Sequence, residues 1–169
     1  MLSGVTFSVY CQLHTFGYSG RNFNFHHFFA IYDAFTRTNL AFVFDDFTIR
    51  QALEKMEIAG YSALPIINRR GEYRGTLTEG DLLWALKNLC YMDMRQAEAH
   101  RIMQITHRRD NIPVRVNTSM QDLISRASTQ NFVPVVDDKD TFIGIVTRRS
   151  IMQYCQQQMF AETKAQRTG

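Results

Sequence analysis

Two stretches of this chain carry the same pattern of residues at a constant offset of 69 positions. The first is ALPIINRRGEYRGTLTEGDLLWAL, which begins at residue 63, and the second is FVPVVDDKDTFIGIVTRRSIMQYC, which begins at residue 132. Pro65 aligns with Pro134, and Thr78 aligns with Thr147. Internal repeats are single supersecondary units that bury their apolar faces against a neighbouring copy. The chain is therefore predicted to fold as two copies of one unit of about 50 residues.

Each copy is predicted to contain the order β-α-β-β-α. A first strand is indicated by the apolar runs LAFVF (40–44) and IPVRV (112–116). Apolar residues at helical spacing follow in 48–56 and 119–127 and predict a helix. The proline-centred strand then runs into a turn, NRRGEY or DDKDTF, whose Gly, Asn and Asp residues tolerate tight backbone angles. A third strand ends at the shared threonine, and the last helix starts directly after it.

This arrangement resembles a tandem pair of CBS (cystathionine-β-synthase) domains, the Bateman module. The resemblance extends over residues 40–158 and rests on two aligned copies of a proline-centred strand and a Gly-x-x-Thr-x-x-(Asp/Ser) junction. It implies an α/β (α+β) fold in which the two repeats pack with pseudo-two-fold symmetry. We expect an N-terminal extension (1–39), a first CBS domain (40–90, copy 1), a linker helix (91–104), a second CBS domain (105–158, copy 2) and a C-terminal tail (159–169).

The composition is that of an ordinary soluble globular chain. Hydrophobic residues make up 45% and charged residues 21% of the 169 residues, and the net charge is only +3. Cys11, Cys90 and Cys155 are far apart and odd in number, which is a poor disulfide framework and favours a reducing compartment. No apolar run approaches the ~18 residues of a membrane span, and the first residues lack the pattern of a secretory signal. We therefore expect a cytoplasmic protein.

The first 39 residues lie outside the resemblance and show neither a helical nor a strand period. Three interpretations stay open: a flexible extension, an added strand and helix, or a segment foreign to the functional unit. Cys11, His14, His26 and His27 do not have the spacing of a recognised zinc site, so no metal site is predicted. The chain also contains no nucleophile elbow, paired catalytic carboxylates, P-loop or Rossmann fingerprint. We therefore expect no catalytic residues, no enzyme activity and no required cofactor.

The junction GTLTEGD of copy 1 places Thr78 at a strand end, shortly before Asp81. Thr-x-x-Asp ahead of an apolar run is typical of a capping box, in which both side chains satisfy free backbone groups at a helix start. The same free donors can also bind a phosphate group. The resemblance to CBS pairs implies that this Thr contacts a nucleotide phosphate and this Asp its ribose. The two roles are compatible, and both stay open.

The junction GIVTRRS of copy 2 keeps Thr147 but has Ser150 in place of the carboxylate, which weakens the expectation of ribose binding there. Arg148 and Arg149 fall in the first turn of the predicted helix, where the positive end of the helix dipole disfavours cations. An anion held by the hydroxyl, the backbone donors and both guanidinium groups would explain them. The alternative is that both arginines point into water. Because Glu79 makes the copy 1 junction less favourable for phosphate, one phosphate site per chain is expected.

Small residues precede the proline of the copy 1 strand and would let a flat base approach the backbone. In CBS pairs an adenine lies between the repeats, against such strands and the first strand of a unit. Mapped by motif, the resemblance places the base against copy 1 and the two arginines of copy 2 opposite it. A plain core role is the alternative, and it is expected for Leu64, Ile66, Val133 and Val135. The full predicted ligand site is Leu40, Ala41, Ser62, Ala63, Pro65, Thr78, Asp81, Phe132, Val133, Pro134, Thr147, Arg148, Arg149 and Ser150.

These residues predict a regulatory or sensor module that binds AMP, ADP or ATP in the cleft between the repeats and modulates an unknown partner protein. The combination of GYSALP and TRR is also similar to small bacterial CBS-pair proteins that bind cyclic di-AMP, which is the alternative ligand. A second alternative is an unliganded dimerisation or interaction scaffold. CBS pairs commonly form disc-like dimers, so a homodimer is expected.

A third alternative is nucleic-acid binding through Arg69, Arg70, Arg74 and residues 107–109. It is disfavoured because no aromatic stacking pattern accompanies these arginines. The basic turn HRRDN, residues 107–111, is expected to be a solvated loop. No membrane partner is expected.

Overall fold

The computed structural model of this protein describes residues 40–108 and 110–156. Copy 1 forms the predicted order β-α-β-β-α. Its elements are β1 (Val43–Phe44), α3 (Ile49–Ala59), β2 (Ala63–Ile67), β3 (Tyr73–Thr78) and α4 (Glu79–Asn88). Strand β1 runs parallel to β2, and β2 runs antiparallel to β3.

Copy 2 repeats this order. The strand register is the same in both sheets, because Ala63 pairs with Thr78 in copy 1 and Phe132 pairs with Thr147 in copy 2. The copies are therefore equivalent in backbone pairing as well as in sequence pattern. The elements of copy 2 are β4 (Val114–Arg115), α6 (Met120–Thr129), β5 (Phe132–Val136), β6 (Phe142–Thr147) and a helix over 148–156 of the described chain.

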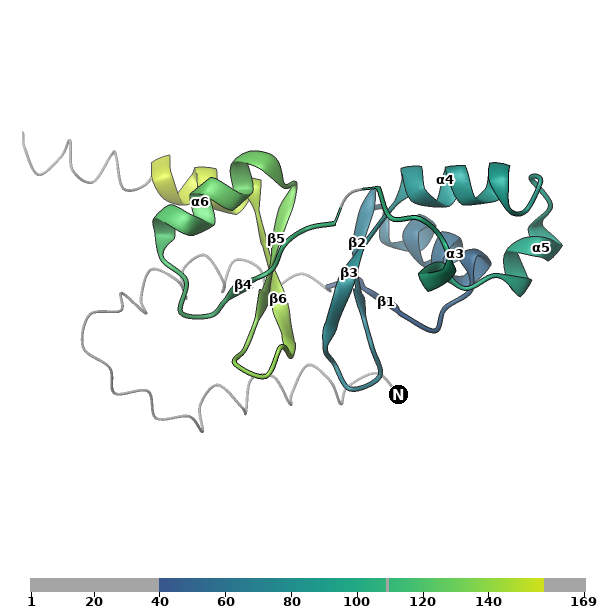
Figure 1. Ribbon diagram of the computed structural model, residues 1–169. Coiled ribbons are helices and arrows are strands. Elements are labelled where there is room, and N and C mark those ends of the chain that lie inside the picture. Colours follow the sequence, from purple (N-terminus) through teal and green to yellow (C-terminus); the bar gives the residue numbers. More distant parts are fainter. Residues whose placement is uncertain (1–39, 109, 157–169) are drawn as a thin grey trace, which may run out of the picture.

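The two sheets lie next to each other in the middle of the molecule, ordered β1-β2-β3 and β4-β5-β6 (Figure 1). Helices α3 and α4 cover the outer side of the first sheet, and α6 covers the outer side of the second. Both hairpins turn at one end of the molecule, and both strand-to-helix junctions lie at the other. The predicted α/β fold with two β-α-β-β-α units is confirmed.

The linker between the copies is not the single helix predicted over 91–104. A short helix, α5 (Met94–Ala99), is followed by a separate 3₁₀ turn, η1 (Ile102–Gln104). The helix breaks because the residues between them bond to the start of copy 1 in an extended conformation. The Ile49 amide donates to the His100 carbonyl at 2.9 Å.

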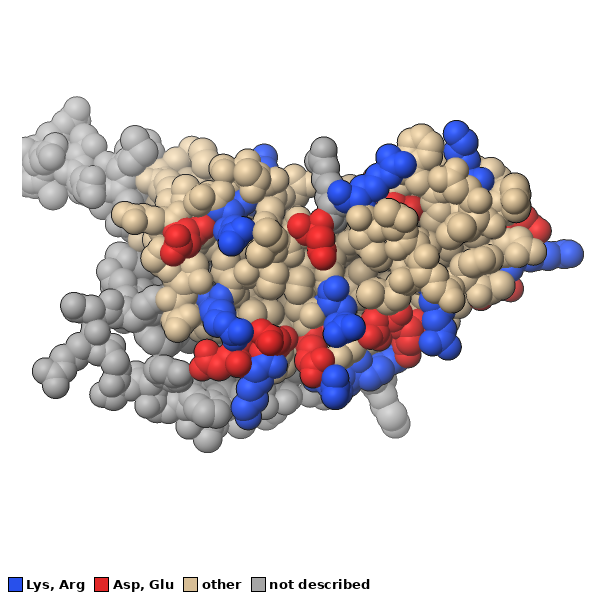
Figure 2. Space-filling view, in the orientation of Figure 1, with Lys and Arg blue, Asp and Glu red and all other residues tan. Residues whose placement is uncertain are grey.

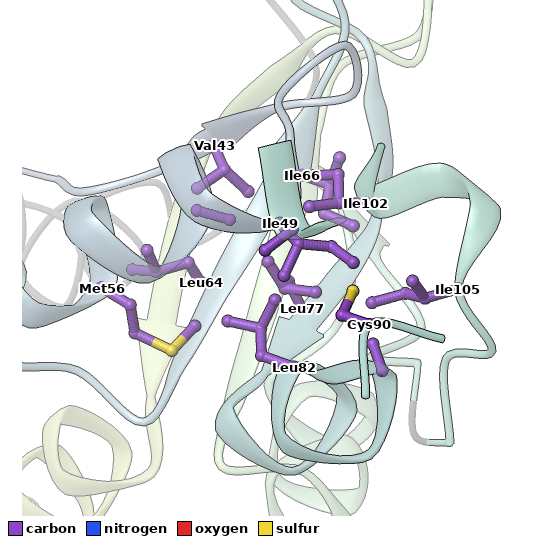
Figure 3. Close-up of a cluster of buried hydrophobic side chains, with 13 residues drawn as sticks. Val43, Ile49, Met56, Leu64, Ile66, Leu77, Leu82, Cys90, Ile102 and Ile105 are labelled. Atoms are coloured by element: carbon purple, nitrogen blue, oxygen red, sulfur yellow. The ribbon is translucent and has the colours of Figure 1, made fainter. Parts of the chain in front are cut away.

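The linker and the residues that flank it complete the core of copy 1. Figure 3 shows this cluster, in which Cys90, Ile102 and Ile105 meet Ile49 of α3 and Leu77 of β3. Burial raises the pKa of the Cys90 thiol, which therefore packs as a small neutral group. A separate cluster forms the core of copy 2 and contains Val114, Leu123, Ala127, Val133, Val135, Val146 and Ile151. Within the described residues, no helix combines the length and the apolarity needed to cross a bilayer.

The hairpins of the two copies touch each other. The Phe142 amide donates to the Gly71 carbonyl at 2.7 Å, and the Tyr73 amide donates to the Asp140 carbonyl at 3.3 Å. The rings of Tyr73 and Phe142 stack with their centroids 6.0 Å apart and their planes inclined by 23°. The Tyr73 hydroxyl donates to the Asn111 carbonyl at 2.8 Å, and burial raises its pKa, so this donor keeps its proton at neutral pH. Tyr73 therefore joins the two repeats.

We expect a double-mutant cycle on Tyr73→Ala and Phe142→Ala to give a coupling free energy of about 0.5–1.5 kcal/mol, because stacked aromatic pairs contribute this much beyond area burial. Urea unfolding followed by circular dichroism measures the four free energies of unfolding. The control is the same cycle with Tyr61→Ala and Phe142→Ala, since Tyr61 is 47% exposed. The losses in free energy of unfolding from these two substitutions should add. Additive effects for the Tyr73 and Phe142 pair would contradict a contribution of the stack to repeat packing.

Candidate functional site

The strand-to-helix junction of copy 1, which we call corner 1, is a closed capping box. The Asp81 amide donates to the Thr78 hydroxyl at 3.2 Å, while the Thr78 amide and hydroxyl donate to Asp81 Oδ2 at 3.0 and 2.7 Å. Asp81 is only 2% exposed. The capping interpretation of this motif is confirmed.

The second carboxylate oxygen of Asp81 is occupied as well. Asp81 Oδ1 accepts from the Arg108 amide at 3.0 Å. A buried carboxylate is costly unless its oxygens accept hydrogen bonds, and here each oxygen serves a backbone donor. A ribose contact by Asp81 would require one of these bonds to open, and it stays a prediction.

The equivalent junction of copy 2, which we call corner 2, is capped more weakly. The Ser150 amide donates to Thr147 Oγ1 at 3.1 Å, and the two hydroxyl oxygens lie 2.8 Å apart. Ser150 is half-buried, whereas Asp81 at the equivalent position is buried. Corner 2 therefore has no carboxylate at this position and is more open to solvent than corner 1.

Arg148 is at the start of its own helix, but its side chain reaches the end of another. Its Nε donates to the Ala127 carbonyl at 2.8 Å and its Nη2 to the Gln130 carbonyl at 3.2 Å. The last carbonyls of a helix lack partners within the helix, and the negative end of the dipole attracts cations there. The C-terminus of α6 thus stabilises a cation that the N-terminus of its own helix disfavours. Sequence reasoning missed this role of Arg148.

The Arg149 side chain differs from that of Arg148 in its hydrogen bonding. It is exposed, and within residues 40–108 and 110–156 no hydrogen bond or ion pair holds its guanidinium group. The corresponding position in copy 1 is Gly80, with the acidic Glu79 and Asp81 on either side. The two corners therefore share one backbone geometry and carry opposite charge. Phosphate binding by Arg148 and Arg149 stays a prediction.

The four residues predicted to contact a base lie at one end of the first sheet. The parallel pairing of β1 with β2 places Leu40 and Ala41 alongside the start of β2, where Ser62 and Ala63 lie. All four are exposed or half-buried, so a ligand can reach them.

The other predicted contacts on the proline strands are buried. Phe132 and Val133 are 5% and 0% exposed, and Pro65 and Pro134 are buried too. The core role expected for Leu64, Ile66, Val133 and Val135 is confirmed.

The hairpin end of the molecule carries charges of both signs, which alternate over the surface in Figure 2. Arg69 binds Asp46 through two hydrogen bonds of 2.9 and 3.0 Å, and Arg70 pairs with Glu72 at 3.2 Å. The hydrogen bond from Arg69 holds the pKa of Asp46 below its usual value. A shallow depression between the copies lies at this end, lined by Tyr73, Arg74 and Lys139 among others, and not at the corners. Two arginines of the basic set considered for nucleic-acid binding, Arg69 and Arg70, are therefore paired with carboxylates.

Comparison with known proteins decides the family. A family profile described as CBS domain matches residues 31–88 and 102–157. The chain belongs to the CBS domain family. No curated protein sequence matches it significantly.

Solved CBS structures share the fold of this pair. A CbpB structure in complex with c-di-AMP aligns with a TM-score of 0.65 and 20% identity over 75% of this chain and 83% of that one. CbpB from Listeria monocytogenes, also in complex with c-di-AMP, gives 0.63 and 20% over 72% and 90%. CBSX2 in complex with AMP gives 0.56 and 24% over 72% and 90%.

The basic turn at 107–111 was expected to be a solvated loop, but two of its described residues, Arg108 and Asp110, bond to copy 1 of this CBS pair. Arg108 and Asp110 are exposed, but the Arg108 amide binds Asp81, and Asp110 Oδ1 accepts from the Thr76 amide at 2.9 Å. One feature of the sequence pointed to these contacts: an acidic residue, Asp110, near the end of a basic turn and just before a strand. No group of three potential metal ligands occurs among the described residues, and Cys11, His14, His26 and His27, for which no metal site was predicted, lie outside them.

Proposed function

We propose that this CBS pair is a regulatory module that binds an adenine nucleotide at corner 2, with a phosphate at the helix start and the base against copy 1. The observation that carries this proposal is the charge difference between equivalent corners: Arg148 and Arg149 occupy corner 2, while corner 1 is acidic. Backbone donors at a helix start and guanidinium groups together favour phosphate. Among the residues that the structure describes, no hydrogen bond or ion pair of Arg149 would have to break for it to bind an anion there.

The proposed ligands are AMP, ADP or ATP, and cyclic di-AMP is the alternative. Two CbpB structures contain c-di-AMP, and the CBSX2 structure contains AMP. Both classes present an adenine and at least one phosphate, which are the two groups that the proposed site would contact. The affinities of the protein for AMP, ADP and ATP, compared with its affinity for cyclic di-AMP, distinguish the two classes.

The experiment is isothermal titration calorimetry of the purified chain with AMP, ADP, ATP, S-adenosylmethionine and cyclic di-AMP, with uridine monophosphate as the control for base recognition. We expect micromolar affinity for at least one adenine nucleotide, about 8 kcal/mol of binding free energy, and none for the control. Absence of heat and of any thermal shift with every ligand would reject the sensor proposal. The unliganded scaffold would then be the better description.

A ligand regulates a protein only if it binds one of two states more tightly than the other. For a binding module without enzymatic activity, these states are free and partner-bound forms, or different assemblies of the module itself. Leu83, Trp84 and Leu89 are 54%, 37% and 40% exposed on and just after α4. We propose that this face joins a second copy in a cytoplasmic homodimer. Light scattering that gives a monomer mass at micromolar concentration would reject the dimer without affecting the ligand proposal.

A further inference from the structure

Three residues of the connection between the copies bond to copy 1, and we call them the crossing residues: Arg108, Asp110 and Asn111. The Arg108 amide donates to Asp81 Oδ1 at 3.0 Å. The Thr76 amide donates to Asp110 Oδ1 at 2.9 Å. The Asp81 carboxylate and the Thr76 amide of copy 1 therefore already have hydrogen-bond partners from within the chain.

The contact at Asp110 is close as well as polar. A Cβ atom added at Gly75 would lie 3.2 Å from Asp110 Oδ1, so a side chain there would press on this carboxylate. Gly75 also has φ of +149°, a conformation that other residues rarely adopt. Beside it, the Arg108 guanidinium lies 4.6 Å from the centre of the Trp84 ring on α4. Arg108 and Asp110 thus lie against both β3 and α4.

Residues of copy 2 also form hydrogen bonds with the connection between the copies. Asn111 Nδ2 donates to the Phe132 carbonyl at 2.9 Å. The side chain of Gln130, which is 8% exposed, accepts from the Ile112 amide at 3.0 Å and donates to the Ile112 carbonyl at 3.2 Å. These bonds fix the connection at both ends, so its position against corner 1 is set by the fold.

The charges reinforce this geometry. Glu79, Asp81 and Asp110 gather three carboxylates at or beside corner 1. A nucleotide phosphate there would meet these like charges, although the Arg108 guanidinium also lies near, against Trp84. The Thr76 amide on the preceding strand is already bonded to Asp110 and offers no free donor. At corner 2 the equivalent helix start carries Arg148 and Arg149 instead.

We infer that Arg108 and Asp110 fill corner 1 from within the chain, and that Asp110 restricts nucleotide binding to corner 2, giving one ligand per chain. This inference rests on the proposed function. Asp110 acts by excluding the ligand from corner 1 through charge and by occupying the backbone donor of Thr76.

The test is the stoichiometry of AMP binding, measured by calorimetry on wild type, Asp110→Ala and the control Glu57→Ala, which removes an equal charge from an exposed position on α3. We expect one AMP per chain for wild type and for Glu57→Ala, and a second binding event for Asp110→Ala. Two AMP per wild-type chain, or a folded Asp110→Ala that still binds one, would overturn the inference while leaving the proposed function intact. No AMP or cyclic di-AMP bound by any of the three proteins would overturn both.

A second measurement needs no variant. In amide spectra of the wild type at saturating AMP, we expect the resonances of Thr147 and Ser150 to move and those of Thr76 and Arg108 to keep their positions. Equal shifts at both corners would show that AMP displaces the crossing residues, and would overturn the inference.

Discussion

Replacing Asp81 with alanine is expected to lower the free energy of unfolding by about 3 kcal/mol in the absence of any ligand. The change removes an N-terminal cap, which costs about 1 kcal/mol, and leaves the Thr78 and Arg108 amides without their charged acceptor. Hydrogen bonds to charged groups contribute roughly 1.5–3 kcal/mol, and the losses here overlap because one carboxylate serves all of them. Urea unfolding at neutral pH, followed by circular dichroism, measures the effect.

The repeat itself supplies the matched control. Ser150→Ala changes the equivalent position of copy 2, where the one side-chain hydrogen bond among the described residues is to the Thr147 hydroxyl. We expect it to cost about 0.5–1 kcal/mol. If Asp81→Ala destabilised the protein no more than Ser150→Ala, the structural role of the Asp81 carboxylate would be wrong.

The architecture could be predicted from the sequence because the same pattern of strands and helices occurs independently in each copy. Pro65 and Pro134, and Thr78 and Thr147, fix the strand-to-helix junctions by sequence offset, and the register of both sheets follows them. Local rules were also sufficient for the cap at Thr78, since its partner lies within the same turn.

Contacts that depend on tertiary packing could not be predicted. The acceptors of Arg148 lie at the end of α6, and only the pairing of β5 with β6 brings that end to the junction. The path of Arg108 and Asp110 over corner 1 depends on how two repeats pack, which no pattern within one repeat encodes. The linker helix stops before His100 because that residue bonds to the start of α3, a partner remote in sequence.

The arginines of corner 2 give the largest effect expected on binding. The double variant Arg148→Ala/Arg149→Ala should weaken AMP affinity a hundredfold or more, since two charge-assisted contacts contribute roughly 1.5–3 kcal/mol each and 1.4 kcal/mol is a factor of ten. Calorimetry measures the affinity, and Arg95→Ala, an exposed arginine on α5, is the control that removes one positive charge away from the corner.

The single variants separate the two roles that Arg148 combines. Arg149→Ala should weaken AMP binding at least tenfold and leave the free energy of unfolding within about 0.5 kcal/mol of wild type, because its guanidinium is exposed. Arg148→Ala should weaken binding and also destabilise the protein by about 1–2 kcal/mol, because the Ala127 and Gln130 carbonyls lose their donors. An AMP affinity that survives the double substitution would leave Arg148 as a cap for α6 alone. The opposite charges of the two corners would then have no bearing on ligand choice, and the nucleotide would have to bind elsewhere in the pair.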